Sequence, residues 1–304
     1  MAVAFSRFLP PIVGQRFRDL IFPVKVLFGN TDSMRVRSVT RALFEAKVGD
    51  FHAAKFVIQG YYDWRGWAVA LAVAKPGDTI VEVGANIGTE SVGFRDIVGD
   101  DGKIYAFEPM PSNYQTLMNN VLINKWSNVI CYPFAVGEKE GKVHFVKPEQ
   151  EWMSGVGRVL GEGEISSNAV FEVKMVTLDQ YINEFERLKL IFIDTEGHDL
   201  NVLKGSRAVL LRYKPVVVLE VSPKLLRKAG TGVLDVMEFF EEMKYSCFEV
   251  GKLGLIEPVT FKSKKSANWV CVPKDDSGKV NEINRALWRC GMMPLHRGIN
   301  PLCL

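Results

Sequence analysis

Residues 79–89, Thr-Ile-Val-Glu-Val-Gly-Ala-Asn-Ile-Gly-Thr, decide the fold of this 304-residue chain. The first five are β-branched apart from Glu82, as in a buried strand, and residues 89–98 are expected to form a helix. Between the two, Gly84 and Gly88 allow a tight turn and a close approach of the backbone to a ligand. A helix that begins directly after such a turn is typical of a nucleotide-type cofactor site.

The alternation of strand and helix continues along the chain. The pattern predicts strands at residues 79–83, 103–107, 128–132, 190–193, 215–219, 246–250 and 268–272, and a strand pair at 143–146 and 171–176. It predicts helices at residues 33–46, 67–74, 89–98, 111–124, 178–185, 199–209, 233–243 and 281–288. Nearly continuous apolar strands between helices indicate an α/β fold with a doubly wound, mostly parallel sheet covered on both faces. Such sheets bind ligands beyond the carboxyl ends of their strands.

Composition and charge exclude several other classes of protein. The chain is 47% hydrophobic and 24% charged, as in globular proteins and unlike disordered or collagenous ones. A net charge of +3 without a run of basic residues argues against a nucleic-acid partner. The five cysteines include no CxxC pair, which argues against a disulfide framework or a structural zinc site. With no signal-peptide pattern and no apolar stretch of membrane-spanning length, we expect a cytoplasmic protein.

These patterns divide the chain into three parts. Residues 1–60 are a partly helical N-terminal extension, residues 61–280 the α/β domain, and residues 281–304 a C-terminal helix and tail. Residues 1–28 mix phenylalanines with basic side chains. That mixture fits packing on the domain, packing on a second copy in a homodimer, or peripheral contact with a membrane surface.

Glu82 separates the two cofactors that such a sheet commonly binds. A dinucleotide fingerprint needs G-x-G-x-x-G, whereas residues 84–89 read G-A-N-I-G-T. A carboxylate just before the loop would repel a pyrophosphate but would stabilise S-adenosylmethionine, which carries an ammonium and a sulfonium. Glu108 ends the second strand, 20 residues beyond Gly88, where an acidic side chain accepts ribose hydroxyls. NAD enzymes share this second feature.

Six segments together resemble the FkbM family of S-adenosylmethionine-dependent methyltransferases. They are residues 81–88 (VEVGANIG), 105–109 (YAFEP), 176–179 (VTLD), 191–197 (IFIDTEG), 203–205 (LKG) and 214–220 (KPVVVLE). The resemblance implies a Rossmann-like class I methyltransferase core, with a seven-stranded sheet whose last strand, at 268–272, is antiparallel. It does not extend to residues 1–55 or 280–304. Glu82 replaces the commoner aspartate, and Phe192 stands where the family usually has a lysine that would contact the acceptor.

The resemblance and the strand ends give the candidate site residues. For the cofactor they are Glu82, Gly84, Ala85, Asn86, Gly88, Glu108, Pro109 and Ala135. Asp194, Glu196 and His198 follow the fourth strand and are expected to face the acceptor. An alcohol acceptor loses a proton on methylation, so a positioned base is expected there. His198 precedes an expected helix whose dipole favours a neutral imidazole, the form that can accept a proton. The alternative is a structural role, in which the His198 side chain caps the helix or hydrogen-bonds the loop.

Several other side chains allow more than one interpretation. Asp194, Glu196, His198 and Glu220 could together hold a divalent cation, but their spacing matches no compact metal motif and we predict no metal site. The aromatic residues of 61–67 and the segment 152–154 either cover the ligands or pack against the sheet. His52, His144 and His296 lie at no predicted strand end and are expected on the surface or in the core.

The sequence therefore predicts an O-methyltransferase that moves a methyl group from S-adenosylmethionine to a hydroxyl. The resemblance implies that a sugar or a glycosylated natural product is the acceptor. An NAD-dependent oxidoreductase and a non-catalytic S-adenosylmethionine-binding module remain as alternatives.

Overall fold

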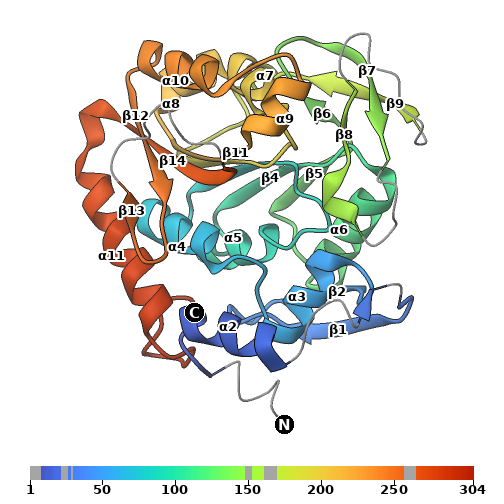
Figure 1. The fold of residues 1–304 in the computed structure, drawn as a ribbon, viewed down its shortest axis with the longest axis vertical. Coiled ribbons are helices and arrows are strands. Elements are labelled where there is room, and N and C mark those ends of the chain that lie inside the picture. Colours follow the sequence, from blue (N-terminus) through green and yellow to red (C-terminus); the bar gives the residue numbers. More distant parts are fainter. Residues whose placement is uncertain (1–7, 22–26, 29, 148–152, 161–169, 257–264) are drawn as a thin grey trace.

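The computed structural model describes residues 8–21, 27–28, 30–147, 153–160, 170–256 and 265–304. Its centre is a sheet of eight described strands in the order β13-β12-β14-β11-β10-β3-β4-β5 (Figure 1). The parallel strands on one side are β3 (Thr79–Val83), β4 (Lys103–Phe107), β5 (Val129–Tyr132), β10 (Leu188–Ile193) and β11 (Val216–Val221). The predicted antiparallel strand is confirmed, because β14 (Ala267–Pro273) runs opposite to both β11 and β12 (Tyr245–Val250). The two-residue β13 (Leu255–Ile256) adds an eighth strand to the seven predicted.

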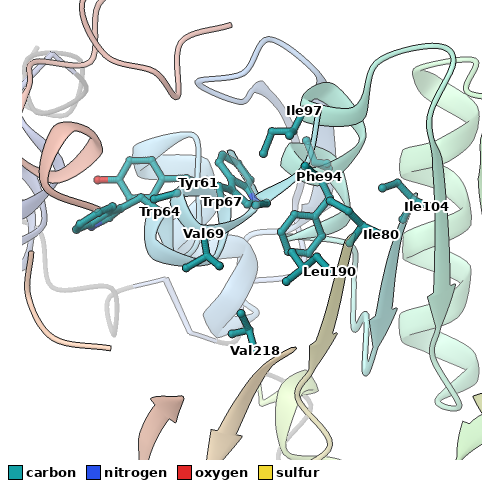
Figure 2. Packing of buried hydrophobic residues seen from close by; sticks show 14 of the residues in the cluster. Tyr61, Trp64, Trp67, Val69, Ile80, Phe94, Ile97, Ile104, Leu190 and Val218 are labelled. Atoms are coloured by element: carbon teal, nitrogen blue, oxygen red, sulfur yellow. The ribbon is translucent and has the colours of Figure 1, made fainter. Parts of the chain in front are cut away.

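Side chains of the parallel strands alternate between two buried faces, as the strand geometry requires. Ile80, Leu190 and Val218 belong to one face, and Figure 2 shows Phe94 beside Ile80 and Leu190 there. The helices that cover this face are α4 (Trp64–Val73), α5 (Ser91–Val98), α6 (Pro111–Ile123) and α11 (Gly278–Met292). The opposite face is covered by α7 (Asp199–Lys204), α8 (Arg207–Tyr213), α9 (Pro223–Lys228) and α10 (Val233–Glu242). The predicted two-sided covering of the sheet is confirmed.

The strand order reverses at β3. The chain runs outward from β3 to β4 and β5, and β10 then pairs with the other side of β3. At the carboxyl ends of this pair the backbone N–H of Asp194 donates to the carbonyl oxygen of Val83 at 2.9 Å. A reversal of this kind opens a crevice beyond the strand ends, which is where α/β sheets bind their ligands.

The predicted helix over residues 33–46 is wrong, because β1 (Ser33–Arg37) and β2 (Leu43–Lys47) form an antiparallel hairpin. Asn120 of α6 and Asn124, the residue that caps the end of α6, bind the free edge of β2. Asn120 Oδ1 accepts from the Glu45 N–H at 2.7 Å, and Asn124 contacts both the N–H and the carbonyl oxygen of Leu43, at 2.8 and 2.7 Å. These long-range hydrogen bonds favour the strand over the helix that the local apolar spacing predicts.

The rest of the N-terminal extension contributes to the main core. Figure 1 shows α2 (Pro11–Ile21), α3 (Phe51–Gln59) and the hairpin together at one end of the molecule. Phe44 of β2 stacks on Phe56 of α3 at 4.0 Å between ring centroids, and both belong to the buried cluster that contains Trp67. Residues 1–7 and 22–26, within the segment predicted to contact a membrane or a second subunit, lie outside the described residues. Among the helices that the structure describes, none is both long and apolar enough to cross a membrane.

The part of the chain that follows β5 forms a second sheet of order β6-β9-β7-β8. Its strands are β6 (Ala135–Val136), β7 (Gly141–Val146), β8 (Arg158–Val159) and β9 (Val170–Val176), and the predicted pairing of residues 143–146 with 171–176 is confirmed. Short 3-10 turns lie at Ser154–Val156, Leu178–Tyr181 and Lys274–Asp276.

Two predicted helices on the next part of the chain differ from the structure. Residues 178–185 form only the turn at Leu178–Tyr181, since the Asp179 carboxylate accepts the N–H groups of Ala208 and Val209 at the start of α8. The predicted helix over 199–209 is divided into α7 and α8 at Gly205. A Cβ on Gly205 would lie 1.9 Å from the carbonyl oxygen of Gly137, so the chain turns where the two backbones meet.

Candidate active site

A cavity of about 730 Å³ lies at the carboxyl ends of β3, β4, β10 and β11. This volume falls in the range of pockets that enclose small-molecule ligands. Its floor comes from the strand ends and the loop after β3, and its walls come from α3, the start of α4 and residues 153–157. All predicted site residues line the cavity except Gly88, which lies in the same loop.

The backbone of the loop after β3 lies close to the backbone at the end of β10. Gly84 has φ +84°, and a Cβ there would lie 1.9 Å from the carbonyl oxygen of Asp194. Asn86 also adopts the left-handed region, with φ +49°. The N–H of Asn86 points to β4, and its buried Oδ1 has no hydrogen-bond partner within the described residues. The tight turn predicted from the glycines is therefore present, and its contacts with the ends of β4 and β10 are seen only in the structure.

Glu108 follows β4 and is held in place by two backbone hydrogen bonds. Its Oε2 accepts from the Asn86 N–H and its Oε1 from the Met110 N–H, both at 2.8 Å. Burial raises the pKa of Glu108 to about 7, while these two hydrogen bonds act in the opposite direction. Each carboxylate oxygen can accept a second hydrogen bond. The arrangement fits a ligand with two adjacent hydroxyls, such as the ribose of an adenosine.

Glu82 and Glu90 place two further carboxyls beneath the loop. Glu82 is buried inside β3 and accepts a hydrogen bond from the Ser91 hydroxyl. Burial raises its pKa to about 8. Glu90 was not predicted as a site residue, although it follows the glycine loop directly. Its Oε1 accepts from the Asp63 N–H at 3.4 Å, and its buried Oε2 lacks a hydrogen-bond partner among the described residues. Burial raises the pKa of Glu90 well above its ordinary value.

Three more carboxylates meet where β10 and β11 end. One oxygen from each of Asp194, Glu196 and Glu220 lies within 4.8 Å of the others. Burial raises the pKa of Glu196 to about 7, with a further contribution from Glu220, and the pKa of Asp194 is raised well above its ordinary value for the same reasons. Such a cluster fits a cation, either a divalent metal or the charged end of S-adenosylmethionine.

Asp199, which the sequence marks only as the start of a helix, holds the loop that carries these acids. Its carboxylate accepts from the N–H and the hydroxyl of Thr195, at 3.2 and 2.9 Å, and from the Gly197 N–H at 3.1 Å. Glu196 and Gly197 both have positive φ, at +53° and +98°. The resulting turn directs residues 194–196 toward the cavity.

His198 directly precedes α7, as predicted, but its side chain makes no capping hydrogen bond. Burial lowers the pKa of His198 to about 4, so the imidazole is uncharged near neutral pH. The sequence indicated the helix dipole as the cause of the neutral form, whereas the structure points to burial. Nδ1 lies 3.0 Å from Asn201 Nδ2, and Nε2 lies 3.0 Å from the position of a Cβ on Gly137.

The aromatic wall of the cavity consists of Phe51, His52 and Tyr62. The His52 and Tyr62 rings lie 4.4 Å apart, and Phe51 meets the His52 ring edge-on at 5.6 Å. His52 therefore lines the cavity, so its expected place on the surface or as core filler is wrong. Of the residues expected either to cover the ligands or to pack on the sheet, those that line the cavity are Tyr62, Met153 and Ser154. Those buried in the core are Tyr61, Trp64 and Trp67. Trp152 lies outside the described residues.

The family described as "Methyltransferase FkbM domain" matches residues 82–247, which is more than half of the chain. The chain belongs to the FkbM methyltransferase family. The resemblance of the sequence segments is thereby confirmed, and methyl transfer from S-adenosylmethionine is the reaction class of this chain. The family also decides between S-adenosylmethionine and NAD, which Glu108 alone does not separate.

This FkbM chain is also similar to individual proteins and solved structures. It is 28% identical over 215 residues to "Hexuronic acid methyltransferase AglP" of Haloferax volcanii, a match that covers 67% of this chain and 82% of the relative. The FkbM methyltransferase structure from Methylobacillus flagellatus matches with a TM-score of 0.45 and 15% identity, covering 89% of this chain and 58% of that chain. TYW2 of M. jannaschii, solved in complex with AdoMet, matches with a TM-score of 0.40 and 12% identity over 81% and 86% of the two chains. The present chain thus spans just under three fifths of the length of the Methylobacillus protein.

Proposed function

We propose that this FkbM chain is an O-methyltransferase that acts on a hydroxyl of a sugar or of a glycosylated natural product. The observation that carries the proposal is one cavity lined both by buried carboxyls at the strand ends and by aromatic side chains on α3 and before α4. The carboxyls suit a cationic cofactor, and the aromatic side chains suit the apolar face of a sugar ring. The relative described as a hexuronic acid methyltransferase supports a sugar-type acceptor.

The chain's own residues would hold the cofactor in two regions of the cavity. Glu108 and Asn86 would bind the adenosine end, since both offer acceptor atoms near the glycine loop. Glu82 would lie near the positively charged end, where a neighbouring cation favours the ionised form of this carboxyl and is stabilised by it. When bound, S-adenosylmethionine supplies a methyl group carried on a positively charged sulfur. Pro109, Ala85 and Ala135 would form the apolar surface around the cofactor, and Gly84 and Gly88 would permit the close backbone approach.

Glu196 and Asp194, the acids after β10, would remove the proton from the acceptor hydroxyl and orient the acceptor. Glu196 has a pKa of about 7, so a large fraction of it is ionised at neutral pH and can accept the hydroxyl proton. Asp194, beside it, holds its own proton more strongly and would orient the acceptor. Alignment of two bound reactants can lower a barrier by about 7–11 kcal/mol, and the walls of the cavity supply that alignment.

The test is release of S-adenosylhomocysteine from the purified chain with a panel of acceptors. The panel contains neutral hexosides, uronides and aryl glycosides, with a catechol and a thiol as non-sugar controls. We expect turnover on at least one sugar class and none on the non-sugar controls. Binding of S-adenosylmethionine without turnover on any sugar would favour the non-catalytic binding module, and turnover on the catechol or the thiol alone would overturn the acceptor class.

A further inference from the structure

Glu90 is an acid of the cavity whose hydrogen bonding is incomplete. Its residue is only 6% exposed and lines the cavity. Oε1 accepts from the Asp63 N–H at 3.4 Å, whereas Oε2 is enclosed and has no hydrogen-bond partner within the described part of the chain. Because buried polar atoms in native proteins are almost always paired, a ligand is expected to supply the donor for Oε2.

The other two buried acids around the glycine loop already have donors from the chain. Glu82 accepts from the Ser91 hydroxyl, and Glu108 accepts the N–H groups of Asn86 and Met110. Among the carboxyl oxygens that the structure describes, Glu90 Oε2 is the one that is both enclosed and unpaired. Glu90 therefore needs a ligand more than its two neighbours do.

The start of α4 fixes the position of Glu90. Trp67 Nε1 donates to the Glu90 carbonyl oxygen at 3.1 Å, and Asp63, which binds Oε1, is the N-cap of α4. Gly66 comes so close that a Cβ on it would lie 3.2 Å from Glu90 Oε2 and 3.1 Å from Cε2 of Phe192. Glycine is a poor residue for the interior of a helix, and here it leaves a space beside Oε2 that alanine would fill.

The groups around Oε2 favour a cation. Burial, together with the carboxyls of Asp63, Glu82 and Asp194, raises the pKa of Glu90 well above its ordinary value. Arg65 pairs with Asp63 Oδ1 at 3.3 Å and leaves Oε2 without a partner. A protonated Glu90 could donate to an anion, but the same acids would repel that anion. A cation that donates a hydrogen bond would complete Oε2 and favour its ionised form.

We propose that Glu90 Oε2 binds the ammonium group at the amino-acid end of S-adenosylmethionine. The ammonium carries a positive charge and three donors, whereas the sulfonium has no donor. Glu90 takes its contacts from α4, and Glu108 takes its contacts from the glycine loop and the residues after β4, so the two acids can bind different ends of one cofactor. The inference rests on the cofactor of the family and not on the proposed acceptor, so it can fail while the proposed function stands.

Calorimetric titration with analogues of the cofactor tests this role. The ligands are S-adenosylmethionine, S-adenosylhomocysteine, decarboxylated S-adenosylhomocysteine, and a deaminated S-adenosylhomocysteine in which hydrogen replaces the amino group. The variants are Glu90→Gln, which keeps the shape and removes the charge, and Gly66→Ala, which fills the space beside Oε2. Glu172→Gln is the matched control, since Glu172 is an exposed acid that pairs with Lys142 at 2.7 Å on the second sheet.

We expect Glu90→Gln to weaken binding of S-adenosylhomocysteine and of its decarboxylated analogue about tenfold or more, the effect of a lost charged hydrogen bond. The deaminated analogue has no ammonium and should bind Glu90→Gln at least as well as it binds the wild type. Gly66→Ala should weaken the ligands that carry the amino group more than the deaminated one, and it tests the site independently if Glu90→Gln does not fold. Glu172→Gln should match the wild type with every ligand.

Three results would overturn the role of Glu90. Wild-type affinity of Glu90→Gln for S-adenosylhomocysteine would show that no charged contact is made there. An equal loss for the deaminated analogue would mean that Glu90 only supports the shape of the loop. A loss confined to S-adenosylmethionine would make the sulfonium, and not the ammonium, the group that Glu90 stabilises.

Discussion

Asn201 Nδ2 lies 3.0 Å from His198 Nδ1. In this orientation of the Asn201 amide its NH₂ donates to His198 Nδ1, and the ring proton is then assigned to Nε2. Nε2 has no hydrogen-bond partner among the described residues. In this tautomer His198 cannot take a proton at Nε2. We therefore propose Glu196 as the base and His198 as a donor near the acceptor.

The variant His198→Ala should lower kcat about tenfold or more through loss of this donor, with little effect on cofactor affinity. His198→Gln, which retains a donor, should recover part of the rate. Because burial lowers the pKa of His198 to about 4, neither change should move the acidic limb of the pH profile measured between pH 5.5 and 9. A shift of that limb in His198→Gln would return the imidazole to the role of general base, and wild-type kcat in His198→Ala would make it structural.

Glu108 offers a separate test of the cofactor site. Glu108→Ala removes a carboxylate that holds the Asn86 and Met110 N–H groups, so it should weaken binding of S-adenosylhomocysteine about tenfold or more. Calorimetric titration measures the effect. Glu138, which is paired with Lys204 on the surface at 3.7 Å, provides the matched control in Glu138→Ala. Unchanged affinity in Glu108→Ala would remove Glu108 from the cofactor site.

The central sheet was predictable because its signals are local. Each parallel strand is a short apolar run bounded by a turn. Glu82 lies inside the run of β3, and Glu108 and Asp194 stand directly after β4 and β10. Sheet topology then brings Glu108 and Asp194 to the same edge. The sequence therefore indicated both the fold class and most of the cavity floor.

The walls of the cavity depend on contacts between distant segments, which one sequence does not reveal. The β1–β2 hairpin is stabilised by Asn120 and Asn124, which lie far along the chain. His52 and Lys55 stand on a helix whose start is fixed by Asp50, and the same carboxylate binds Ser154. The capping aspartate was a usable signal for α3, but nothing local to residues 50–55 indicated that this helix faces the strand ends.

Proton binding by the buried carboxyls should make the stability of the cofactor-free chain depend on pH. The pKa values of Glu82, Glu108 and Glu196 are raised to about 8, 7 and 7, above the values of an unfolded chain. Between pH 6.5 and 8.5 the folded state therefore binds more protons than the unfolded state, and its free energy of unfolding should fall as the pH rises. His52 and His198, with pKa values lowered to about 4, oppose this trend only at the lower end of the window, because an unfolded histidine is half protonated near pH 6.5 and largely neutral above about pH 7.5.

Thermal unfolding at several pH values measures this dependence. We expect Tm of the cofactor-free chain to decrease from pH 6.5 to 8.5, and Glu82→Gln to reduce the slope because it removes the highest of the three pKa values. Binding of a cationic ligand should release protons over the same range, which calorimetry in buffers of different ionisation enthalpy detects. A Tm that rises through this window would contradict the assignment of protonated carboxyls.

The junction of Gly84 with Asp194 gives the last prediction. Gly84→Ala places a Cβ 1.9 Å from the Asp194 carbonyl oxygen at a residue with φ +84°, so the loop and the end of β10 must separate. Backbone strain and overpacking each cost about 1–3 kcal/mol, and we expect a loss of at least about 3 kcal/mol in the free energy of unfolding, measured by denaturant titration. Gly278→Ala, at a helix position where a Cβ would meet nothing within 4 Å, is the control and should stay within about 1 kcal/mol of the wild type. Asn86 lies in the turn that begins at Gly84, and Asp194 packs against that glycine, so cofactor affinity should fall together with stability. A Gly84→Ala protein with wild-type stability and normal affinity would show that β3 and β10 can separate here without cost.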